Sequence, residues 1–361
     1  MKSRYLFISV CLLCCIVAAC NGDAPKKQSA TGYDEQIEIV FIPKVTENDF
    51  FESANDGVQA YSAKYGFTVT YKGSPIASVA EQNKIIEEAI KGSAAAICIA
   101  PLDATALDAT LKKASAAGIK VVTWDSDVSP DARTVMVSQG TPTQLGKMLV
   151  EMGAKSLQQR GLDPSKGKIE YVWHNARSVA AGQNPWYDAG EQYISETYPK
   201  WVNVAAGNYS SQQNPEEALV VGKAILREHP SIDLIICDDS TSLPGQAEAL
   251  QQAGLTARDI TITGFASPKS MRMYCKEGIV ERWGLWDCKV QASLANYLAY
   301  YLASGNTIRV GDRLNVPEIG LIEVMPNSVL GIKGHGDGSS GVVLLPQRSE
   351  FTVTNVDRFD F

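Results

Sequence analysis

Two pairs of neighbouring aspartates are the side chains most able to do chemistry in this sequence: Asp125 with Asp127, and Asp238 with Asp239. Two carboxylates that face each other across a cleft can serve a glycosidase as acid and nucleophile, or can bind a metal ion. The same groups can accept hydrogen bonds from the hydroxyls of a sugar. The pairs alone therefore leave three kinds of site open.

The sequence offers little else that catalysis would need. It contains neither a G-x-S-x-G nor an H-E-x-x-H motif, and its only histidines are His174, His229 and His335. We therefore expect a binding protein with no catalytic residue, no metal ion and no cofactor. The alternative is a cleft enzyme, a glycosidase or a sugar-phosphate hydrolase, that uses Asp125 and Asp238.

Aromatic side chains are the second ingredient of a sugar site, because a polyol has apolar C–H faces as well as hydroxyls. For each ring taken singly, packing in the core is the alternative interpretation. Lys44 adds a positive charge at the end of the first apolar run, shortly before two phenylalanines. The aromatic candidates are Phe50, Phe51, Trp124, Trp173, Trp186, Phe265 and Trp286.

These residues lie along a regular alternation of short β-branched runs and longer amphipathic stretches. The alternation is typical of parallel sheets with crossover helices. The sequence therefore predicts an α/β protein with two doubly wound, Rossmann-like lobes. Strands are predicted at 37–42, 67–71, 96–100, 121–125, 134–138, 168–173, 202–209, 232–237 and 260–265, and helices around 79–90, 141–160, 184–198, 215–228 and 242–253.

Four of the predicted strands end abruptly in polar residues, at Lys44, Asp125, His174 and Asp238. In a doubly wound sheet the ligand crevice lies outside the carboxyl ends of the strands. We therefore expect these four strand ends to converge on one cleft.

Length and charge restrict the class of protein. The 361 residues, 45% of them hydrophobic, exceed what one ordinary core needs and favour two lobes. The formal net charge is −7, and a chain that starts at Cys20 has 31 basic and 40 acidic side chains, a net charge of −9. An acidic surface of this kind argues against nucleic acid as a partner.

The N-terminus has the features of a bacterial lipoprotein signal. Lys2 and Arg4 precede the apolar run 5–19, and small residues stand directly before Cys20. We predict a signal peptide over 1–19, lipidation of Cys20 and a flexible tether over 20–35. The protein is then extracytoplasmic and lipid-anchored to a bacterial membrane. Secretory cleavage without a lipid is the alternative.

Four cysteines follow the tether. Cys98 and Cys237 lie inside predicted strands, where small buried hydrophobic residues are expected. Cys275 and Cys288 flank another predicted strand and are the only candidates for a disulfide in an oxidising compartment. The sequence alone does not supply the geometry that such a bridge requires.

Eight segments carry a resemblance to a known family: Ile42-Pro43-Lys44, 122–127, 139–142, 149–152, 284–287, 326–328, 343–346 and the ending Asp360-Phe361. Together they resemble the autoinducer-2-binding proteins of the Lsr type, over nearly all of 37–361. The resemblance implies a type I periplasmic binding protein, which is the receptor subunit of an ABC importer. Such a receptor closes two lobes on a small hydroxylated, furanose-like signal, and a membrane permease is its partner. Monomer is the default state of this architecture.

The resemblance also implies a set of ligand contacts, of which this chain keeps only a part. Lys44, Asp125 and Gln183 match the family's contacts, whereas Gly182 stands where the family has an aspartate. Asp238 and Ser240 replace a proline and an alanine that contact the ligand largely through backbone groups. The predicted ligand-binding residues are Lys44, Asp125, Gln183, Asp238, Ser240, Phe50, Phe51, Phe265 and Trp286.

The loss at Gly182 leaves the ligand open between two kinds of binding protein. Our hypothesis is that Asp238 supplies the missing carboxylate, so that autoinducer-2 is still bound. The alternative is a receptor for rhamnose or another simple sugar. The lipoprotein signal and the lack of a basic DNA-binding segment argue against a third possibility, a regulator core of similar fold.

The expected lobes are discontinuous in sequence. We predict crossings between them near 139–141, 265–267 and 305–310. The N-terminal lobe is then formed by 36–139 and 267–306, and the C-terminal lobe by 140–266 and 307–361. Three short crossings permit a hinge that opens and closes the cleft.

Overall fold

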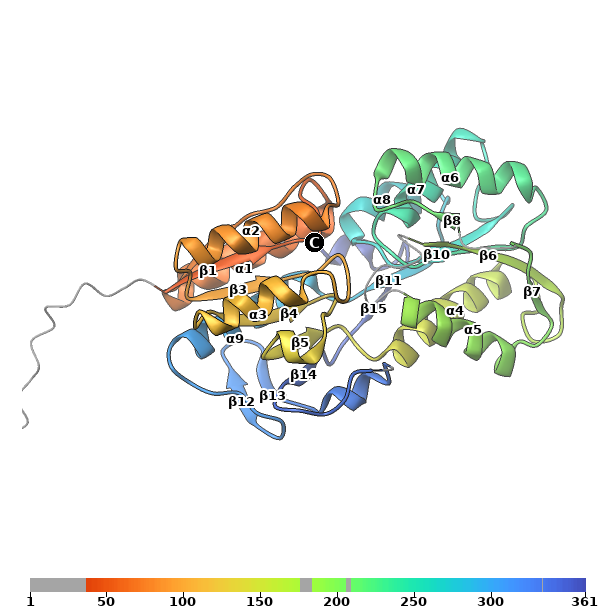
Figure 1. The fold of residues 1–361 in the computed structure, drawn as a ribbon. Coiled ribbons are helices and arrows are strands. Elements are labelled where there is room, and N and C mark those ends of the chain that lie inside the picture. The colour runs from red at the N-terminus through yellow and green to blue at the C-terminus, as the bar shows by residue number, and fades with distance from the viewer. Residues whose placement is uncertain (1–36, 176–183, 206–208, 333) are drawn as a thin grey trace, which may run out of the picture. The chain divides into compact units, whose positions relative to one another are not determined.

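The computed structural model describes residues 37–175, 184–205, 209–332 and 334–361. The predictions for Cys20, for the tether, for Gly182 and for Gln183 lie outside the described residues. One compact unit, from Gln36 to Phe361, contains two parallel sheets, so the α/β class is confirmed (Figure 1).

The first sheet has six parallel strands. It consists of β1 (Glu38–Ile42), β2 (Thr68–Tyr71), β3 (Ala96–Ile99), β4 (Lys120–Trp124), β5 (Val135–Ser138) and β14 (Gly341–Leu344), in the order β14-β5-β4-β3-β1-β2. Its strands β3 and β5 are buried along their whole length because a parallel sheet is covered on both faces.

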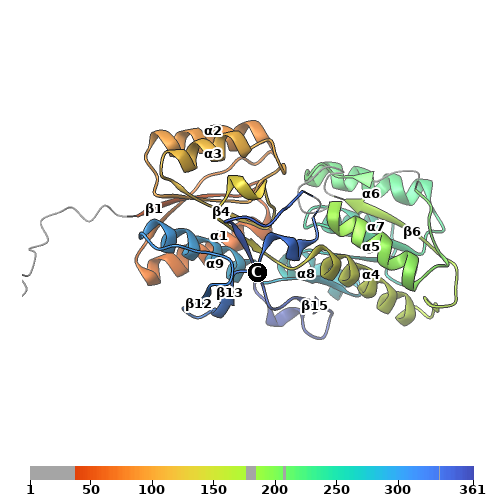
Figure 2. The ribbon, with the colours of Figure 1, turned by 60° about the horizontal axis from the view of Figure 1, so that its bottom comes forward.

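Helices cover both faces of this sheet. Figure 2 shows α2 (Val79–Lys91) and α3 (Asp108–Ala116) on one side, and α1 (Asp49–Tyr65) and α9 (Cys288–Ala303) on the other. Alternate residues of β1 serve the two faces: Ile39 and Phe41 belong to one core cluster, and Val40 and Ile42 to the other.

The second sheet is also parallel. It contains β6 (Ile169–Asn175), β7 (Trp201–Asn203), β9 (Leu234–Cys237) and β10 (Thr261–Gly264) in the order β10-β9-β6-β7, and β8 (Tyr209–Ser210) pairs with the end of β6. In Figure 1, α4 (Pro142–Gln159) and α5 (Asn184–Thr197) lie below its strands. α6 (Pro215–Glu228) and α7 (Ser242–Gln252) lie above them, beside α8 (Pro268–Lys276).

The first crossing into the second sheet ends in a well-defined helix start. The Thr141 side chain accepts a hydrogen bond from the backbone N–H of Gln144, whose own side chain accepts from the N–H of Thr141. Pro142 occupies the first helical position of α4, where its missing N–H costs nothing. This reciprocal cap fixes the direction in which the chain leaves the first sheet.

The two later crossings differ from the prediction. β11 (Trp283–Leu285) is bridged to Phe265 and pairs with β15 (Ser349–Phe351), so 267–285 continues the second sheet. The chain then crosses at 286–287 into α9. It crosses again at 345–348, because β14 pairs with β5 in the first sheet. Residues 307–344 therefore do not belong with the second sheet. The predicted boundary at 307, which assigns all of 307–361 to the C-terminal lobe, is wrong for them.

The hairpin of β12 (Arg313–Val316) and β13 (Gly320–Glu323) precedes β14. Short 3₁₀ helices lie at Pro130–Ala132, Asn327–Leu330 and Val356–Arg358. The error in the boundaries has a simple physical cause. Gly341–Leu344 is an ordinary apolar strand, and sequence patterns do not say which open sheet edge such a strand joins.

The possible disulfide is not formed. Cys275 and Cys288 are both free and buried, as are Cys98 and Cys237. Cys275 lies in α8, beside the second sheet, whereas Cys288 starts α9, which packs on the first sheet. Burial raises the pKa of the Cys275 thiol to about 11, and that of Cys288 is also raised. All four thiols therefore behave as core residues.

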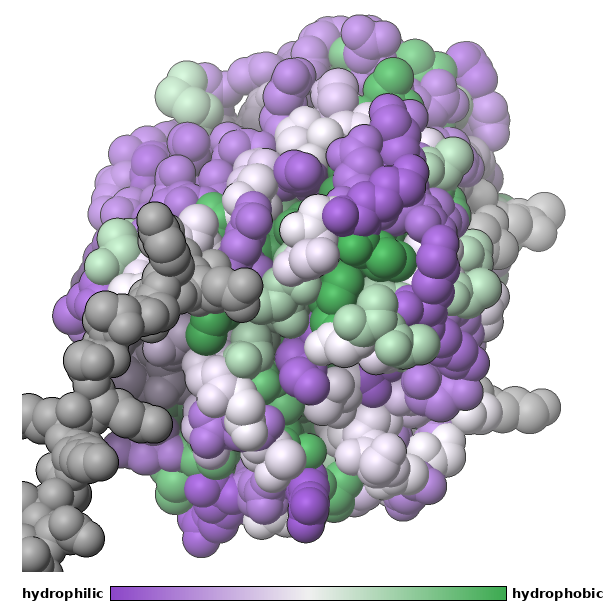
Figure 3. Space-filling view, turned by 60° about the vertical axis from the view of Figure 1, so that its left-hand side comes forward, coloured by the Kyte–Doolittle hydropathy of each residue, from purple (hydrophilic) through white to green (hydrophobic). Residues whose placement is uncertain are grey.

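On the face in Figure 3, many hydrophilic residues lie towards the rim, and less polar and hydrophobic ones lie between them. Among the described helices, none combines the length and apolar character needed to cross a membrane. The large hydrophobic residues that are most exposed, Ile76, Met273, Leu321, Val353 and Val220, are scattered over different elements.

Candidate functional site

A cavity lies at the carboxyl ends of β1, β4, β9 and β10. Four of its polar lining residues are predicted ones: Lys44 and Asp125 from the first sheet, and Asp238 and Ser240 from the second. The predicted aromatic residues Phe50, Phe51, Phe265 and Trp286 also line it. The cavity thus has the mixed polar and aromatic lining of a small-molecule site.

Lys44 and Asp125 form a buried ion pair in this cavity. The Lys44 ammonium lies 2.8 Å from Oδ2 of Asp125, and the two side chains are 5% and 8% exposed. Lys44 follows β1 and Asp125 follows β4, so the sheet itself sets their separation. A buried pair is held at a desolvation cost, and it presents both a donor and an acceptor to whatever enters the cavity.

The backbone of Asp125 is held in an unusual conformation. Its φ is 62°, in the left-handed region, and the N–H of Ser126 donates to the carbonyl of Trp124 at 2.6 Å, closing a three-residue turn. The carbonyl of Asp125 accepts from Nε2 of Gln139 at 3.0 Å. Strain of this kind persists only where the surrounding structure enforces it, and here it turns the carboxylate towards Lys44.

Asp127 does not belong to the cavity. Its carboxylate accepts two hydrogen bonds from Arg133, at 2.8 and 2.6 Å, and one from the hydroxyl of Thr123 at 2.7 Å. Arg133 also donates to the carbonyl of Gly341 at 2.8 Å and to Oδ1 of Asn327 at 2.9 Å. Through Arg133, Asp127 therefore joins the end of β4 to the C-terminal segment, and it does not line the cavity with Asp125.

The second aspartate pair is divided in the same way. Asp238 is 1% exposed and lines the cavity, beside Ser240. Asp239 accepts from the backbone N–H groups of Thr241 and Ser242, at 3.1 and 2.8 Å, at the start of α7. Burial raises the pKa of Asp239, while the hydrogen bonds from Ser242 and Thr241 act against this rise. Asp239 thus orders the loop that carries Asp238.

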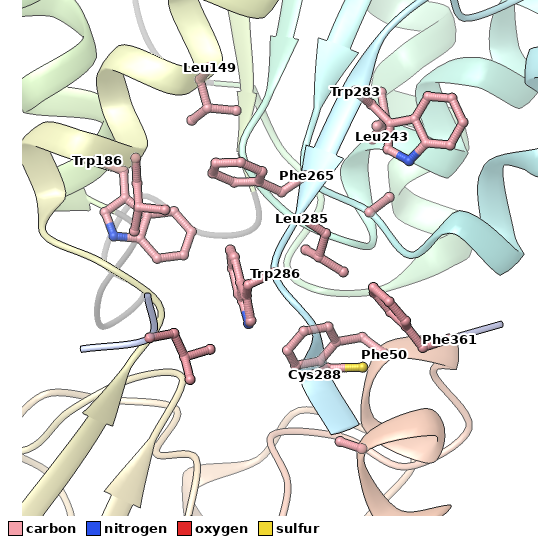
Figure 4. Packing of buried hydrophobic residues seen from close by; sticks show 14 of the residues in the cluster. Phe50, Leu149, Trp186, Leu243, Phe265, Trp283, Leu285, Trp286, Cys288 and Phe361 are labelled. Atoms are coloured by element: carbon pink, nitrogen blue, oxygen red, sulfur yellow. The ribbon is translucent and has the colours of Figure 1, made fainter. Parts of the chain in front are cut away.

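The aromatic wall is built around Trp286. Figure 4 shows its ring between those of Phe265 and Phe50, with Trp186 beside it. The ring centroids of Phe265, Phe50 and Trp186 lie 5.5, 5.9 and 5.9 Å from that of Trp286. Nε1 of Trp286 donates to Oε1 of Gln291 at 2.6 Å, which fixes the ring. The wall offers edges and faces to the apolar side of a ligand.

The other tryptophans serve the core. Trp124 is fully buried and stacks on Phe50 at 6.1 Å, and Trp173 donates from Nε1 to Glu191 at 2.6 Å. Neither of them lines the cavity. For these two rings the core-packing interpretation is the right one.

The three crossings meet beside Asp125. Gln139 from the first crossing accepts from Nε2 of Gln291, at the start of α9, at 2.9 Å. Arg348 from the last crossing donates to the backbone carbonyl of Gln139 at 2.6 Å. The same Gln139 side chain holds the carbonyl of Asp125. These contacts tie the site to the crossings, and no sequence motif marks them.

His174 stands one residue before the end of β6 and does not line the cavity, contrary to the expected convergence of four strand ends. Its ring is fully buried, and Nδ1 lies 3.1 Å from Oε1 of Gln246. Burial lowers its pKa from 6.5 to about 4, against a smaller opposite effect of the Gln246 hydrogen bond. The ring is therefore neutral and structural.

The buried His174 predicts a pH dependence of stability. Its pKa is lower in the folded chain than in the unfolded one, so protonation favours unfolding. The contribution of the neutral ring is complete above pH 6.5 and is lost as the pH falls towards 4. At 1.36 kcal/mol per pKa unit, we expect a loss of roughly 3 kcal/mol over this range. Urea unfolding at several pH values should show a steeper fall for the wild type than for His174→Gln, and parallel curves would contradict the prediction.

Several lining residues were not predicted from the sequence. Gln213, Thr241 and Leu285 are among them. The predicted residue Gln183, in contrast, lies outside the described residues. Gln213 stands in the polar stretch just before Pro215, which opens α6. The only available signal was that this stretch, like those of Lys44 and Asp238, joins the end of a strand to a helix.

Comparisons with known proteins agree on one family. A family model described as "Periplasmic binding protein domain" matches residues 39–307. The structure of LsrB from Clostridium saccharobutylicum in complex with AI-2 is 54% identical, with a TM-score of 0.88, and the similarity covers 90% of this chain and 100% of that one.

More distant relatives bind sugars. The D-ribose/D-allose-binding protein of Pseudomonas aeruginosa is 28% identical over 290 residues, which cover 78% of this chain and 85% of that protein. An ABC transporter solute-binding protein from Clostridium phytofermentas, solved with L-rhamnose, has a TM-score of 0.80 at 22% identity and covers 91% of this chain and 99% of that one. This last similarity concerns the fold alone.

Proposed function

The chain belongs to the periplasmic binding protein family, and we propose that its ligand is autoinducer-2, bound in the cavity at the strand ends. The observation that carries the proposal is the 54% identity, over 90% of the chain, to LsrB in complex with AI-2. The family is extracytoplasmic and supplies the substrate-binding subunits of ABC importers. Anchoring through a lipid on Cys20 is part of the proposal.

We propose two lobes that close on the ligand, with bounds that follow the strand pairing. The first lobe comprises the six-stranded sheet with α1, α2, α3 and α9. The second comprises the sheet of β6 to β10 with α4 to α8 and the β11–β15 pair. Lys44 and Asp125 bind the ligand's hydroxyls from the first lobe, and Asp238 with Ser240 from the second. A ligand held by both sides favours the closed arrangement over the open one, and a permease can recognise that difference.

The relatives are binding proteins, and catalysis is not part of the proposal. Asp125 is engaged by Lys44, and both Asp127 and Asp239 are engaged by structural hydrogen bonds. A glycosidase would need two carboxyl groups free to act as acid and as base or nucleophile. These engagements favour a binding site.

A second candidate is a receptor for a simple sugar. It is favoured by Gly182, which stands where the Lsr-type family has a carboxylate that holds ligand hydroxyls. The ribose/allose-binding relative shows that the family accommodates such ligands. The two candidates differ in the ligand and not in the mechanism.

A substitution of Asp238 tests whether this residue compensates for Gly182, as binding of autoinducer-2 requires in our hypothesis. If it supplies the carboxylate missing at Gly182, Asp238→Ala removes a charge-assisted hydrogen bond to the ligand. Such bonds contribute about 1.5 to 3 kcal/mol, so we expect an affinity for autoinducer-2 that is roughly ten- to a hundredfold lower. Asp188→Ala, on the exposed side of α5, is the matched control and should bind normally. Unchanged affinity in Asp238→Ala would contradict the compensation.

Calorimetric titration of the soluble fragment 21–361 tests the function itself. The autoinducer-2 precursor, rhamnose and ribose are titrated in parallel. We expect saturable binding of the precursor, at micromolar affinity or tighter, and no comparable binding of either sugar. Tighter binding of rhamnose or ribose would replace the first candidate by the second.

A further inference from the structure

Gln213 lines the cavity and has a buried polar atom without a hydrogen-bond partner among the described residues. Its side chain comes from the second lobe and the residue is only 8% exposed. No described residue donates a hydrogen bond to its Oε1, which is itself buried. A buried carbonyl oxygen without a donor is costly, since it has lost its water without gaining a partner. Such an atom in a ligand cavity is positioned to accept a hydrogen bond from a ligand.

The backbone at this position is strained. Gln212 and Gln213 have φ values of 54° and 55°, and the N–H of Asn214 donates to the carbonyl of Ser211 at 2.9 Å. The four residues thus form a tight turn whose two central residues are both left-handed. Glycine, asparagine or aspartate is the usual choice at such positions, because a longer side chain is disfavoured there. Two glutamines are therefore an unusual sequence for this turn.

The turn is held at both ends. The N–H of Ser211 donates to the carbonyl of Asn175, at the end of β6, at 2.9 Å. At the other end, the Asn214 side chain accepts from the N–H of Glu217 at 3.0 Å and caps α6. The strained conformation is therefore imposed by the sheet and by the helix. It directs the Gln213 side chain to the cavity, whereas Gln212 is exposed and donates to the Ser210 hydroxyl.

We propose that Gln213 is a ligand-binding residue whose Oε1 accepts a hydrogen bond from a hydroxyl of the ligand on the side of the second lobe. The inference rests on the proposed function, because it requires a hydroxylated ligand in this cavity. The cavity already holds the carboxylates of Asp125 and Asp238. An uncharged acceptor adds a third hydrogen bond without adding a further negative charge. A site built in this way rejects ligands that lack the matching hydroxyl, since Oε1 then stays unpaired.

The test uses substitutions at the two neighbouring glutamines of the full chain. Gln213→Met keeps the length of the side chain and the strain of the turn but removes the acceptor. We expect its affinity for the ligand that the unchanged chain binds to fall tenfold or more. Gln212→Met makes the same change on the exposed side of the turn and should bind like the unchanged chain.

A glycine pair separates strain from recognition. Gln213→Gly and Gln212→Gly both relieve a left-handed glutamine, so both should raise the midpoint of thermal unfolding of the ligand-free chain. Only Gln213→Gly should also lose affinity. This combination, a more stable chain that binds less well, is not expected from a residue that merely supports the fold.

The probes are the autoinducer-2 precursor, rhamnose and ribose, titrated into each variant. Normal affinity of Gln213→Met in a chain that binds one of these probes would overturn the role of Gln213 alone. Binding of no probe by the unchanged chain would overturn the proposed function, and the inference with it. Equal losses in Gln212→Met and Gln213→Met would also overturn the inference, since the effect would then come from the turn and not from the acceptor.

Discussion

Replacement of Lys44 by methionine is expected to lower the affinity for the ligand by about a hundredfold, which corresponds to about 2.8 kcal/mol. Methionine keeps most of the length of the side chain but removes the ammonium that lies 2.8 Å from Asp125. The ligand then loses a charged donor, and the Asp125 carboxylate is left in a buried site without its cation. Truncating one partner of a buried charge pair costs about 2 to 5 kcal/mol in binding interfaces, and this pair is almost completely buried.

Calorimetric titration measures this change, and Lys113→Met is the matched control. Lys113 pairs with Glu87 at 2.7 Å, but its side chain is 58% exposed, so its removal should leave the affinity unchanged. Thermal unfolding of both variants shows whether they are folded. If Lys44→Met is folded and its affinity lies within about threefold of that of the wild type, roughly 0.7 kcal/mol, the prediction is wrong. Lys44 is then not a ligand-binding residue.

The largest expected effect on stability comes from Arg133. Its side chain is fully buried and donates two hydrogen bonds to Asp127, one to Gly341 and one to Asn327. Arg133→Met would leave the Asp127 carboxylate buried without its cation and would release the C-terminal segment from β4. Breaking a buried pair in this way costs about 3 to 5 kcal/mol. Urea unfolding should therefore show a free energy of unfolding lower by that amount.

Two further variants test whether the uncompensated charge of Asp127 causes the loss of stability. Arg227→Met removes an exposed arginine, paired with Glu228 at 2.9 Å, and should change the free energy of unfolding by less than about 0.5 kcal/mol. The double variant Asp127→Asn/Arg133→Met removes the uncompensated charge and should recover part of the stability. If the double variant is no more stable than Arg133→Met, the loss comes from packing and not from the buried charge.

Much of the fold could be predicted because it depends on local patterns. The mostly apolar run 37–42 and the amphipathic stretch 79–90 predict a buried strand and a surface helix, and the structure has β1 and α2 there. The alternation of such segments then dictates parallel sheets. The cleft at the strand ends follows from the same topology, and so do Lys44, Asp125 and Asp238 as its lining.

The path of the C-terminal segment could not be predicted in this way. β14 pairs with β5, more than two hundred residues before it in the chain, and the hydrogen bonds of Arg133 to Gly341 and Asn327 support this pairing. Nothing in the local sequence of Gly341–Leu344 distinguishes the edge of one sheet from that of the other. Long-range pairing is decided by the whole assembly, and therefore the later crossings were misplaced.

The limits of the site prediction have a similar cause. Residue type and spacing alone do not distinguish Asp125 from Asp127, or Asp238 from Asp239, and only the family resemblance selected Asp125 and Asp238. The division into cavity and structural groups depends on partners distant in the sequence or on the geometry of a helix start. Gln213 escaped prediction for a different reason. Its importance comes from a backbone conformation that glutamine seldom adopts.

The most direct test of the central claim is a crystal structure of the chain grown with the autoinducer-2 precursor. We predict a ligand in the cavity, with its oxygens within about 3.2 Å of the Lys44 ammonium, the Asp125 carboxylate and Oε1 of Gln213. An empty cavity at a saturating concentration of the precursor, or a ligand bound elsewhere on the chain, would contradict the claim.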